Sequence, residues 1–454
     1  MSNQIPHDEI LSKLKQDKVE FVNMQFSDMH GMAKSITIPV SKFADVLKDG
    51  LWFDGSSIEG FTRIFESDML LQPDLSTYQL IPWQQTPDSN NVRFICDVHL
   101  PDGEPYTCDP RYILKKALKE AADADYLFNT GPELEFFLFK KHNEKIIFNS
   151  AGIPEPHDYG AYFDVVPDLG YDVRSQMMRT LMKMGVDIEA GHHEVAAGQH
   201  EIDFRYDDAL ITADRVMTLK TAFKNVAESN GLFISFMPKP ISGINGSGMH
   251  VHQSLFSIKS GDNLFFDDNN DYKLSKLAYS YLAGQMQHVR AMAAILNPLV
   301  NSYKRLVPGY EASTYICWAK TNRSALIRIP RYSKGKIKAT RMEIRNPDPS
   351  ANPYLVFAIL LKAGLYGIKH NLVPPAPVEE DVFEFDHHEL KERGIGTLPG
   401  SLADAVKEFN ESALIRETLG DEFVDKYVRA KMNEWDDFRI SVTDWELKRY
   451  LNII

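Results

Sequence analysis

Hydrophobic and polar positions follow two different rhythms along this chain. The first hundred residues hold short runs of the alternating kind that strands favour, whereas longer segments further on repeat with the 3.6-residue period of a helix. Ile10, Leu11 and Leu14 share one face of a short helix predicted over residues 8–17. The strand-like runs that follow are Val19–Gln25, Ser35–Ile38 and Val92–Val98. This pattern predicts a small sheet domain at the N-terminus.

A change of composition marks the end of this first part. His99–Arg111 contains three prolines, a glycine and three acidic residues, which predicts a linker and a domain boundary. Beyond it, helical and strand-like segments alternate, which indicates a large α+β or α/β domain. The helices predicted there are Ile113–Ala122, Ser175–Met184, Asp214–Ser229 and Leu274–Leu296. The last seventy residues also have a mostly helical pattern.

The longest apolar run, Leu355–Ile368, contains Lys362 and Gly364. It is too short to span a bilayer, and Asn352-Pro353 just before it supplies a helix N-cap and a first-turn proline. We therefore predict a buried helix. The N-terminus lacks a basic start followed by an apolar block, so we expect no signal peptide and no membrane association.

Length and composition narrow the class of protein. A chain of 454 residues is expected to form two or three domains, and 44% hydrophobic with 25% charged residues is ordinary for a globular protein. The cysteines, Cys96, Cys108 and Cys317, lie far apart. Such a set argues against a disulfide framework and against a cysteine metal site, so a reducing cytoplasm is the expected location.

Charge is distributed unevenly. The net charge is −13, yet residues 301–345 hold eleven Lys or Arg and only two acidic residues, Glu311 and Glu343. Several arginines alternate with apolar residues as in strands, and their planar forks match carboxylate and phosphate oxygens. A solvated basic face and a nucleic-acid-binding surface are the alternatives. The interleaved acids and the acidic whole argue against nucleic acid, so an anion site is favoured.

Four strand-like segments place polar groups at every second position. They begin with Glu133-Leu-Glu135 and His250-Val-His252, include Arg341-Met-Glu343-Ile-Arg345, and end with Glu194–Glu201, where Ala197-Gly198 could fold the chain back. Each polar face could simply lie in water. If all four line one concave sheet or open barrel, carboxylates, imidazoles and guanidinium groups converge on a pocket. Such oxygen-rich sites suit Mg²⁺ or Mn²⁺, and with arginine they suit phosphoryl transfer.

Several longer stretches resemble the type I glutamine synthetases of bacteria and archaea, over essentially the whole chain. They are Trp52–Ser57, Gly131–Glu135, His193–Glu201, Asn245–His250, Asn301–Glu311, Asn322–Ser324 and Arg341–Arg345. The resemblance implies an α+β fold: a small β-grasp-like domain over residues 1–104 and a catalytic domain with a curved antiparallel sheet, or open barrel, over residues 105–454. It also implies the ATP-dependent ligation of ammonia to glutamate through γ-glutamyl phosphate.

The resemblance also implies residue roles. Two or three Mg²⁺ or Mn²⁺ ions per site would be held by Glu135, Glu194 and Glu201 and by Glu133, His250 and Glu343. ATP would contact Tyr206, His252, Ser254, Arg328, Lys338 and Arg341. Glutamate would be bound by Arg305, Arg345, Asn245 and Gly246. Arg323 would stabilise the transferring phosphoryl group, and Glu311 would lie on a flap over the intermediate. Ammonium would be bound by Ser57, Tyr162 and Glu201 and deprotonated by Asp54.

In type I glutamine synthetases, the aspartate that matches Asp54 contributes to the active site of a neighbouring subunit. The resemblance therefore implies a homododecamer of two stacked six-membered rings. The C-terminal Arg449–Ile454 resembles the tail that docks into the opposite ring. Phe383 stands where some relatives have an adenylylated tyrosine, so this control is expected to be absent. Arg63 matches the inhibitor-sensing arginine of the shorter subtype, although Pro330–Thr340 departs from that subtype's usual loop. The resemblance leaves open whether regulatory proteins bind this chain.

The nearest alternative is a glutamate–amine ligase of the same fold that uses a polyamine or another amine. Such relatives generally lack the intact Phe53–Ser57 motif, which this chain retains. A non-catalytic relative would have lost metal ligands, and all six are present.

Overall fold

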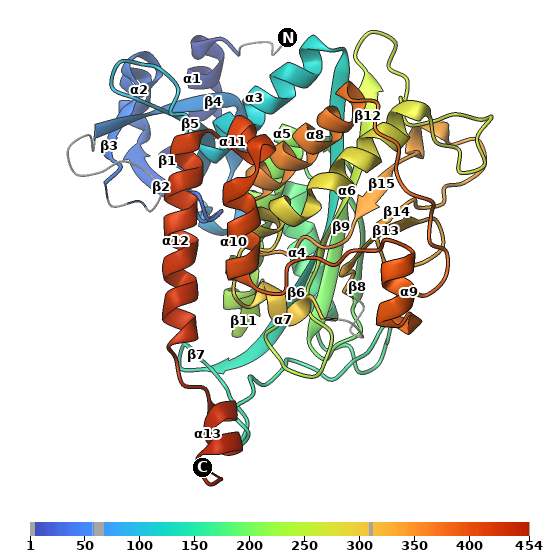
Figure 1. The fold of residues 1–454 in the computed structure, drawn as a ribbon. Helices are drawn as coiled ribbons and strands as arrows, with labels where there is room; N and C mark the ends of the chain where they lie inside the picture. The colour runs from blue at the N-terminus through green and yellow to red at the C-terminus, as the bar shows by residue number, and fades with distance from the viewer. Residues whose placement is uncertain (1–4, 57, 59–67, 308–311, 454) are drawn as a thin grey trace.

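The computed structural model describes residues 5–56, 58, 68–307 and 312–453. It places a small five-stranded sheet beside a larger domain built on a ten-stranded sheet (Figure 1). In the small sheet β1 and β5 pair in parallel at the centre, and the other neighbours are antiparallel. Its strands in spatial order are β2 (Ala33–Pro39), β1 (Val19–Ser27), β5 (Asn90–His99), β4 (Asp68–Leu80) and β3 (Leu51–Asp54). The helices α1 (His7–Gln16) and α2 (Phe43–Asp49) belong to the same domain.

The large sheet is mostly antiparallel and curved. Its main path runs β13 (Tyr315–Ala319), β14 (Ala325–Arg328), β15 (Met342–Ile344), β12 (Met249–Ser257), β6 (Tyr126–His142), β9 (Gln199–Phe204) and β8 (Ile188–His193). The short strands β7 (Lys145–Ile146), β10 (Asp207–Asp208) and β11 (Leu232–Ser235) also pair with β6. The long strand β6 therefore joins both halves of the sheet.

Helices cover the convex side of this sheet, and α8 is buried among them (Figure 1). The helices of the large domain are α3 (Pro110–Asp123), α4 (Tyr171–Lys183), α5 (Ala209–Ser229), α6 (Lys276–Leu296), α7 (Ser302–Arg305), α8 (Pro353–Lys369), α9 (His387–Glu392), α10 (Leu402–Glu411), α11 (Ala413–Leu419), α12 (Asp421–Arg439) and α13 (Asp444–Tyr450), the last of which projects away from the sheet (Figure 1). Short 3-10 helices lie at Val40–Lys42, Pro82–Gln84, Ile337–Ala339 and Val382–Glu384.

Glycines allow α6 and α8 to pack against each other closely. A Cβ on Gly367 would lie 1.9 Å from the carbonyl oxygen of Ser280, and one on Gly364 would lie 2.0 Å from the ring of Tyr281. These distances are far below van der Waals contact, so the two helix backbones can meet here only because these positions carry no side chain.

A buried arginine joins the two domains. Arg111 at the start of α3 is 2% exposed and forms ion pairs with Asp74 and Asp97 of the small sheet and with Asp214 of α5. Tyr354 of α8 donates a hydrogen bond to Asp214 at 2.7 Å. Because a buried charge is costly unless it is paired, this network holds the small sheet in a defined place on the large domain.

The elements predicted from periodicity are found close to their expected bounds, and the run before residue 370 is the buried helix α8 that was predicted. Among the described residues no helix is both long and apolar enough to cross a membrane. Cys96, Cys108 and Cys317 are all buried and unbridged.

Candidate active site

The polar positions predicted on four strands do converge on one face of the large sheet. Residues directly opposite one another on neighbouring strands direct their side chains to the same face. The register pairs Glu133 with His250, and Glu135 with Glu201. Towards β15 and β14, His252 pairs with Glu343, and Glu343 pairs with Arg328. Towards β8, Glu201 pairs with His192. Here this face is called the front face.

The front face forms the floor of a cavity of about 350 Å³ that carboxylates and guanidinium groups line together. The lining residues that the sequence had singled out are Glu133, Glu135, Tyr162, Glu194, Glu201, Asn245, Gly246, His250, Arg305, Arg323, Arg328 and Arg345. Gly248 permits their close approach, since a Cβ there would lie 2.6 Å from Nη2 of Arg305 and 3.2 Å from Oε1 of Glu135.

Glu133, His250 and Glu343 form one group that could hold a metal ion. Their ligand atoms lie within 4.8 Å of one another. Nδ1 of His250 is 3.4 Å from Oε2 of Glu133 and 3.7 Å from Oε1 of Glu343. Burial and the nearby guanidinium of Arg345 lower the pKa of His250. The imidazole is therefore neutral at physiological pH and keeps a lone pair for a cation.

His192, Glu194 and Glu201 form a second group, again with ligand atoms within 4.8 Å. Glu135 lies beside them, held by Nε2 of Gln199 at 2.7 Å and by the backbone N–H of Gly248 at 3.0 Å. Burial and then the charge of Glu194 raise the pKa of Glu135 to about 8, and burial and then Asp203 raise that of Glu201. These carboxylates repel one another, so the donor set fits a divalent cation that would supply the missing positive charge.

Arginines surround Glu343, which is itself fully buried. Nε of Arg328 donates to its Oε2 at 2.6 Å, and Arg345 donates to Oε1. Burial alone would raise the pKa of Glu343, but the positive charge of Arg345 outweighs it and holds the pKa at about 2. Glu343 therefore remains a carboxylate throughout the physiological range.

Arg305 and Arg323 differ in how firmly they are held. Arg305 is 4% exposed, and its guanidinium donates to the carbonyl oxygens of Asn346 at 2.8 Å and Pro347 at 3.3 Å. Arg323 is exposed at the rim of the same cavity. Arg305 therefore has a fixed position, whereas Arg323 can adjust to a ligand.

A second cavity of about 340 Å³ adjoins the first, since Glu133 lines both. It contains five of the six residues expected to contact ATP: Tyr206, His252, Ser254, Lys338 and Arg341. Nε2 of His252 lies 2.7 Å from Oε1 of Glu133, and its Nδ1 accepts from Nε of Arg341 at 3.2 Å. The sixth, Arg328, lines the carboxylate cavity instead.

Four of the predicted residues are not part of this arrangement. Ser57, Arg63 and Glu311 lie outside the described residues. Asp54 ends β3, is exposed, and accepts the backbone N–H of Ser56 at 2.8 Å. Figure 1 shows β3 at the edge of the small domain, on the opposite side of the molecule from β13, β14 and β15. Among the described residues, Asp54 lines neither cavity.

Sequence reasoning assigned no role to two residues of the site, His192 and Gln199. Both lie in or beside the quoted motif, and His192 stands two positions before Glu194. The same period of two that selected Glu133 and Glu135 could have selected His192, whereas only the folded hairpin shows that Gln199 binds Glu135.

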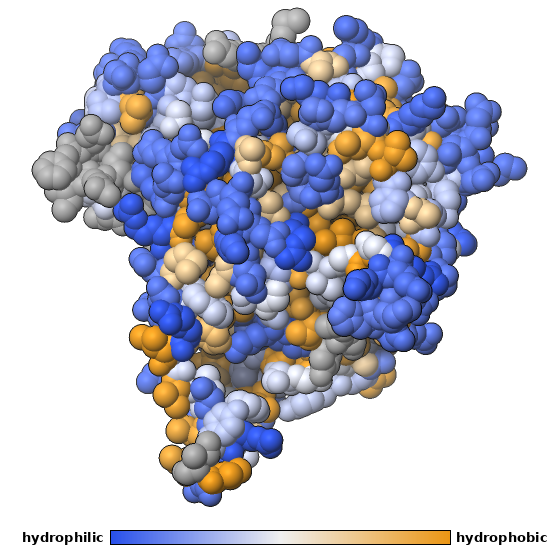
Figure 2. All heavy atoms as spheres, in the orientation of Figure 1, coloured by the Kyte–Doolittle hydropathy of each residue, from blue (hydrophilic) through white to orange (hydrophobic). Residues whose placement is uncertain are grey.

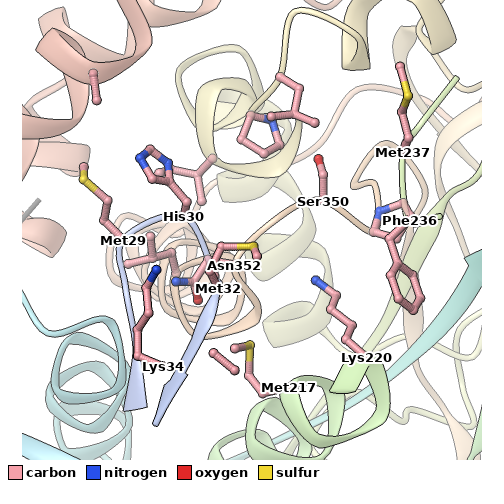
Figure 3. Close-up of a pocket in the computed structure, with 18 of the residues that line it drawn as sticks. Met29, His30, Met32, Lys34, Met217, Lys220, Phe236, Met237, Ser350 and Asn352 are labelled. Atoms are coloured by element: carbon pink, nitrogen blue, oxygen red, sulfur yellow. The ribbon is translucent and has the colours of Figure 1, made fainter. Parts of the chain in front are cut away.

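A larger cavity, of about 920 Å³, lies elsewhere, between the β1–β2 hairpin, α5 and α12. Figure 3 shows its lining of methionines and lysines, among them Met29, Met32, Lys34, Met217 and Lys220. None of the described residues predicted for the active site lines it.

Clustered carboxylates, imidazoles and guanidinium groups on one face define a class of protein, one that handles phosphoryl groups together with divalent cations. Residues 107–450 match the glutamine synthetase catalytic domain, and residues 18–101 match the glutamine synthetase beta-Grasp domain. The chain belongs to the glutamine synthetase family.

Individual relatives agree with this family. The chain is 50% identical to a glutamine synthetase of Clostridium saccharobutylicum, with 98% of each chain covered. It is 48% identical to the glutamine synthetase of Thermus thermophilus, again over 98% of each chain. Among solved structures, it is similar to a Plasmodium falciparum glutamine synthetase, with a TM-score of 0.88 and 25% identity over 98% of this chain and 99% of that one. A GmaS–ADP complex has a TM-score of 0.86 and 32% identity, with 98% and 99% covered.

Proposed function

We propose that the two adjoining cavities form one active site for the ATP-dependent synthesis of glutamine from glutamate and ammonia. The observation that carries this proposal is the front face itself. Five glutamates, two groups of potential metal ligands and four arginines meet there beside a second cavity of about 340 Å³. Relatives of similar length and up to 50% identity are named glutamine synthetases, and the rival amine ligase is not favoured.

Metal-binding roles follow from the donor groups. Glu133, His250 and Glu343 would hold one divalent cation, and Glu135, Glu194 and Glu201 a second, with His192 within reach of it. Mg²⁺ or Mn²⁺ is the expected ion because the donors are mainly carboxylate oxygens. When bound, such ions would neutralise the charge on the phosphoryl oxygens.

The chain's own residues would then bind and orient the substrates. Tyr206, His252, Ser254, Lys338 and Arg341 line the cavity proposed for ATP, with Arg328 at the junction. Arg345 and the fixed Arg305, with Asn245 and Gly246, would bind glutamate. Its γ-carboxylate oxygen attacks the γ-phosphorus of ATP, the bond to ADP breaks, and Arg323 meets the charge on the transferring group.

Ammonia completes the reaction. Ammonium bound near Tyr162 and Glu201, with Ser57, would lose a proton to Asp54. The nitrogen of the resulting ammonia then attacks the acyl carbon, the bond from this carbon to the phosphate oxygen breaks, and the second proton that the nitrogen loses leaves with the phosphate. Glu311 would belong to a flap that excludes water, because an acyl phosphate in contact with water hydrolyses.

Assembly is the second part of the proposal. Asp54 is exposed and remote from its own cavities, which supports a site completed by a neighbouring chain. Apolar side chains also gather over the end of α12 and α13, at the lower left of Figure 2, including Ile440, Trp445 and Leu451. Burial of this tail in another copy suits a homododecamer of two stacked hexameric rings. We expect this assembly in the cytoplasm.

Control by small molecules or regulatory proteins completes the proposal. Phe383 has no hydroxyl group for adenylylation. Arg63 is proposed as the residue that senses an inhibitor, and activity assays with glutamine, AMP and 2-oxoglutarate added singly would identify the effectors.

The direct test is phosphate release from ATP and glutamate, with ammonia compared against methylamine and putrescine. We expect release with ammonia, glutamine as the product and metal dependence. A higher kcat/KM with either amine than with ammonia would contradict the proposed substrate and support the amine ligase.

A further inference from the structure

A buried polar network lies directly behind the proposed metal site, on the opposite face of β8 and β9. Side chains alternate across a strand, so His193 and His200 point away from the cavity that Glu194 and Glu201 line. They are paired in register, and their rings lie 4.7 Å apart. Both side chains are fully buried. The proposed reaction uses neither of them.

Asp158, in the segment before α4, is the centre of this network. Its Oδ1 lies 2.8 Å from Nε2 of His193 and accepts the backbone N–H of Gly198 at 3.1 Å. Its Oδ2 accepts the backbone N–H of Gly170 at 3.1 Å. Gly198 belongs to the turn between β8 and β9, so one buried carboxylate ties this turn, β8 and the start of α4 together.

The network reaches the front face through the backbone. Nδ1 of His193 lies 2.6 Å from the carbonyl oxygen of Glu194, and the N–H of Glu194 donates to the carbonyl oxygen of Gln199 at 2.7 Å. The main chain on both sides of the Glu194 side chain is therefore fixed from behind. His200 adjoins Glu201 in the sequence and is held by Nη1 of Arg174 at 2.9 Å.

Arg174 is itself fixed by a two-pronged ion pair. Its Nη1 and Nη2 donate to the carboxylate oxygens of Asp168 at 3.2 and 2.7 Å. The surrounding backbone is packed against the rings: a Cβ on Gly170 would lie 2.3 Å from His200, and one on Gly160 would lie 2.9 Å from His193. The two rings are therefore packed directly against the backbone at Gly160 and Gly170.

These three residues also have the composition of a metal site, since Asp158, His193 and His200 could offer ligand atoms within 4.8 Å of one another. The hydrogen bonds argue against a metal. A guanidinium group only donates, so Nδ1 of His200 accepts and its Nε2 carries the hydrogen. Nδ1 of His193 faces a carbonyl oxygen and its Nε2 faces a carboxylate, so both donate. The lone pair on Nδ1 of His200 is therefore occupied by Arg174, and its Nε2–H faces Oδ2 of Asp158 at 3.9 Å without a hydrogen bond, so neither ring has a free lone pair to offer.

We propose that Asp158, with His193, His200 and Arg174, is a positioning network that sets the geometry of Glu194 and Glu201 for metal binding. This inference rests on the proposed function, because it assigns those glutamates to a divalent cation. Removing a residue that supports a metal ligand from behind typically lowers the metal affinity about 10- to 100-fold. The Asp158→Asn substitution keeps the size of the side chain, but an amide group can accept hydrogen bonds at only one of its two terminal atoms.

The experiment is a titration of the intact metal-free protein with Mn²⁺, with free Mn²⁺ measured by electron paramagnetic resonance. Glu201→Gln and Glu343→Gln first assign the binding classes to the two groups. Asp158→Asn is then expected to weaken about 10- to 100-fold the class that Glu201→Gln removes. The class that Glu343→Gln removes should change less than about twofold. If wild type binds no Mn²⁺, the proposed function fails, whereas equal binding by wild type and Asp158→Asn refutes only the network.

Asp214→Asn is the matched control, since Asp214 is also a buried carboxylate that accepts from an arginine, Arg111, and from Tyr354. It should lower the melting temperature but leave both Mn²⁺ classes unchanged. Equal weakening of Mn²⁺ binding by both variants would show that the network affects only the general stability of the fold, and it would overturn the proposal. Should Asp158→Asn fail to fold, Arg174→Lys provides the same comparison.

A second result would separate the network from a hidden metal site. In the combined variant Glu201→Gln with Glu343→Gln, we expect no tightly bound Mn²⁺ or Zn²⁺. An equivalent of metal that disappears only on His200→Gln would show that the back of the sheet binds a metal and would overturn the proposal.

Discussion

Mixing two inactive variants tests the proposal that each active site draws residues from two chains. Asp54 lies at the exposed end of β3, remote from the cavities of its own chain, whereas Glu343 is fully buried on the front face of its own chain, where it is a proposed metal ligand. Asp54→Ala removes the proposed ammonium base. Glu343→Gln removes a metal ligand and keeps the side-chain volume in a buried position. Each variant alone should be nearly inactive.

The expected recovery follows from counting the interfaces. A functional site needs a chain with intact Glu343 beside a neighbour with intact Asp54. With the two variants mixed equally and at random around a closed ring, each condition is met at half of the positions. About one quarter of the sites should therefore be complete, whatever the ring size. If each chain built its own site, no complete site would form.

The assay needs mixed oligomers of known composition. The two variants would be coexpressed with different affinity tags, purified through both tags, and tested for glutamine formation. Each variant carrying both tags, purified alone, is the control. Verified mixed oligomers that remain as inactive as these controls would refute the shared site, while the ligase assignment would stand. A series of mixing ratios should follow the product of the two fractions.

The remaining predictions concern metal, arginine and pH. Chelation should abolish activity, Mg²⁺ or Mn²⁺ should restore it, and calorimetry should show about 2.7 kcal/mol of stabilisation at a hundredfold metal excess over Kd; full activity in excess EDTA would contradict this. Arg323→Ala should lower kcat about 10²- to 10³-fold, because a hydrogen-bond donor to the transition state is lost. Arg345→Ala should instead raise the KM for glutamate. An unchanged KM would show that Arg345 does not bind glutamate. Because the folded pKa of Glu135 is raised from 4.5 to about 8, the folded protein prefers the protonated form, so the metal-free protein should lose stability as pH rises from about 5 to 8. Melting curves recorded with EDTA at several pH values should show this loss of stability, and saturating Mg²⁺ or the Glu135→Gln substitution should reduce it. If stability changes equally with pH in all three cases, Glu135 does not titrate in this range.

Local pattern was enough to predict much of this fold. Helices and strands repeat along the chain with fixed periods, so the buried α8 and the polar faces of β6 and β12 follow from the order of apolar and polar residues alone. Predicted bounds differ from the observed ones by a few residues because helix ends depend on capping. Asp208, for example, begins α5 at Ala209 by accepting the N–H of Leu210, five residues before the predicted start.

The sequence by itself also determined the family and therefore the reaction, because the motifs carry the reactive side chains in order. Only the tertiary structure decided how these side chains meet. His252 and Glu133 are 119 positions apart and touch because β12 pairs with β6. The separate pairing of β14 with β15 brings Arg328 to Glu343. The tertiary structure also placed Asp158 behind Glu194 and left Asp54 away from both cavities of its own chain. A local pattern fixes the face on which a side chain lies, but its partners depend on which distant strands pair and how closely they pack.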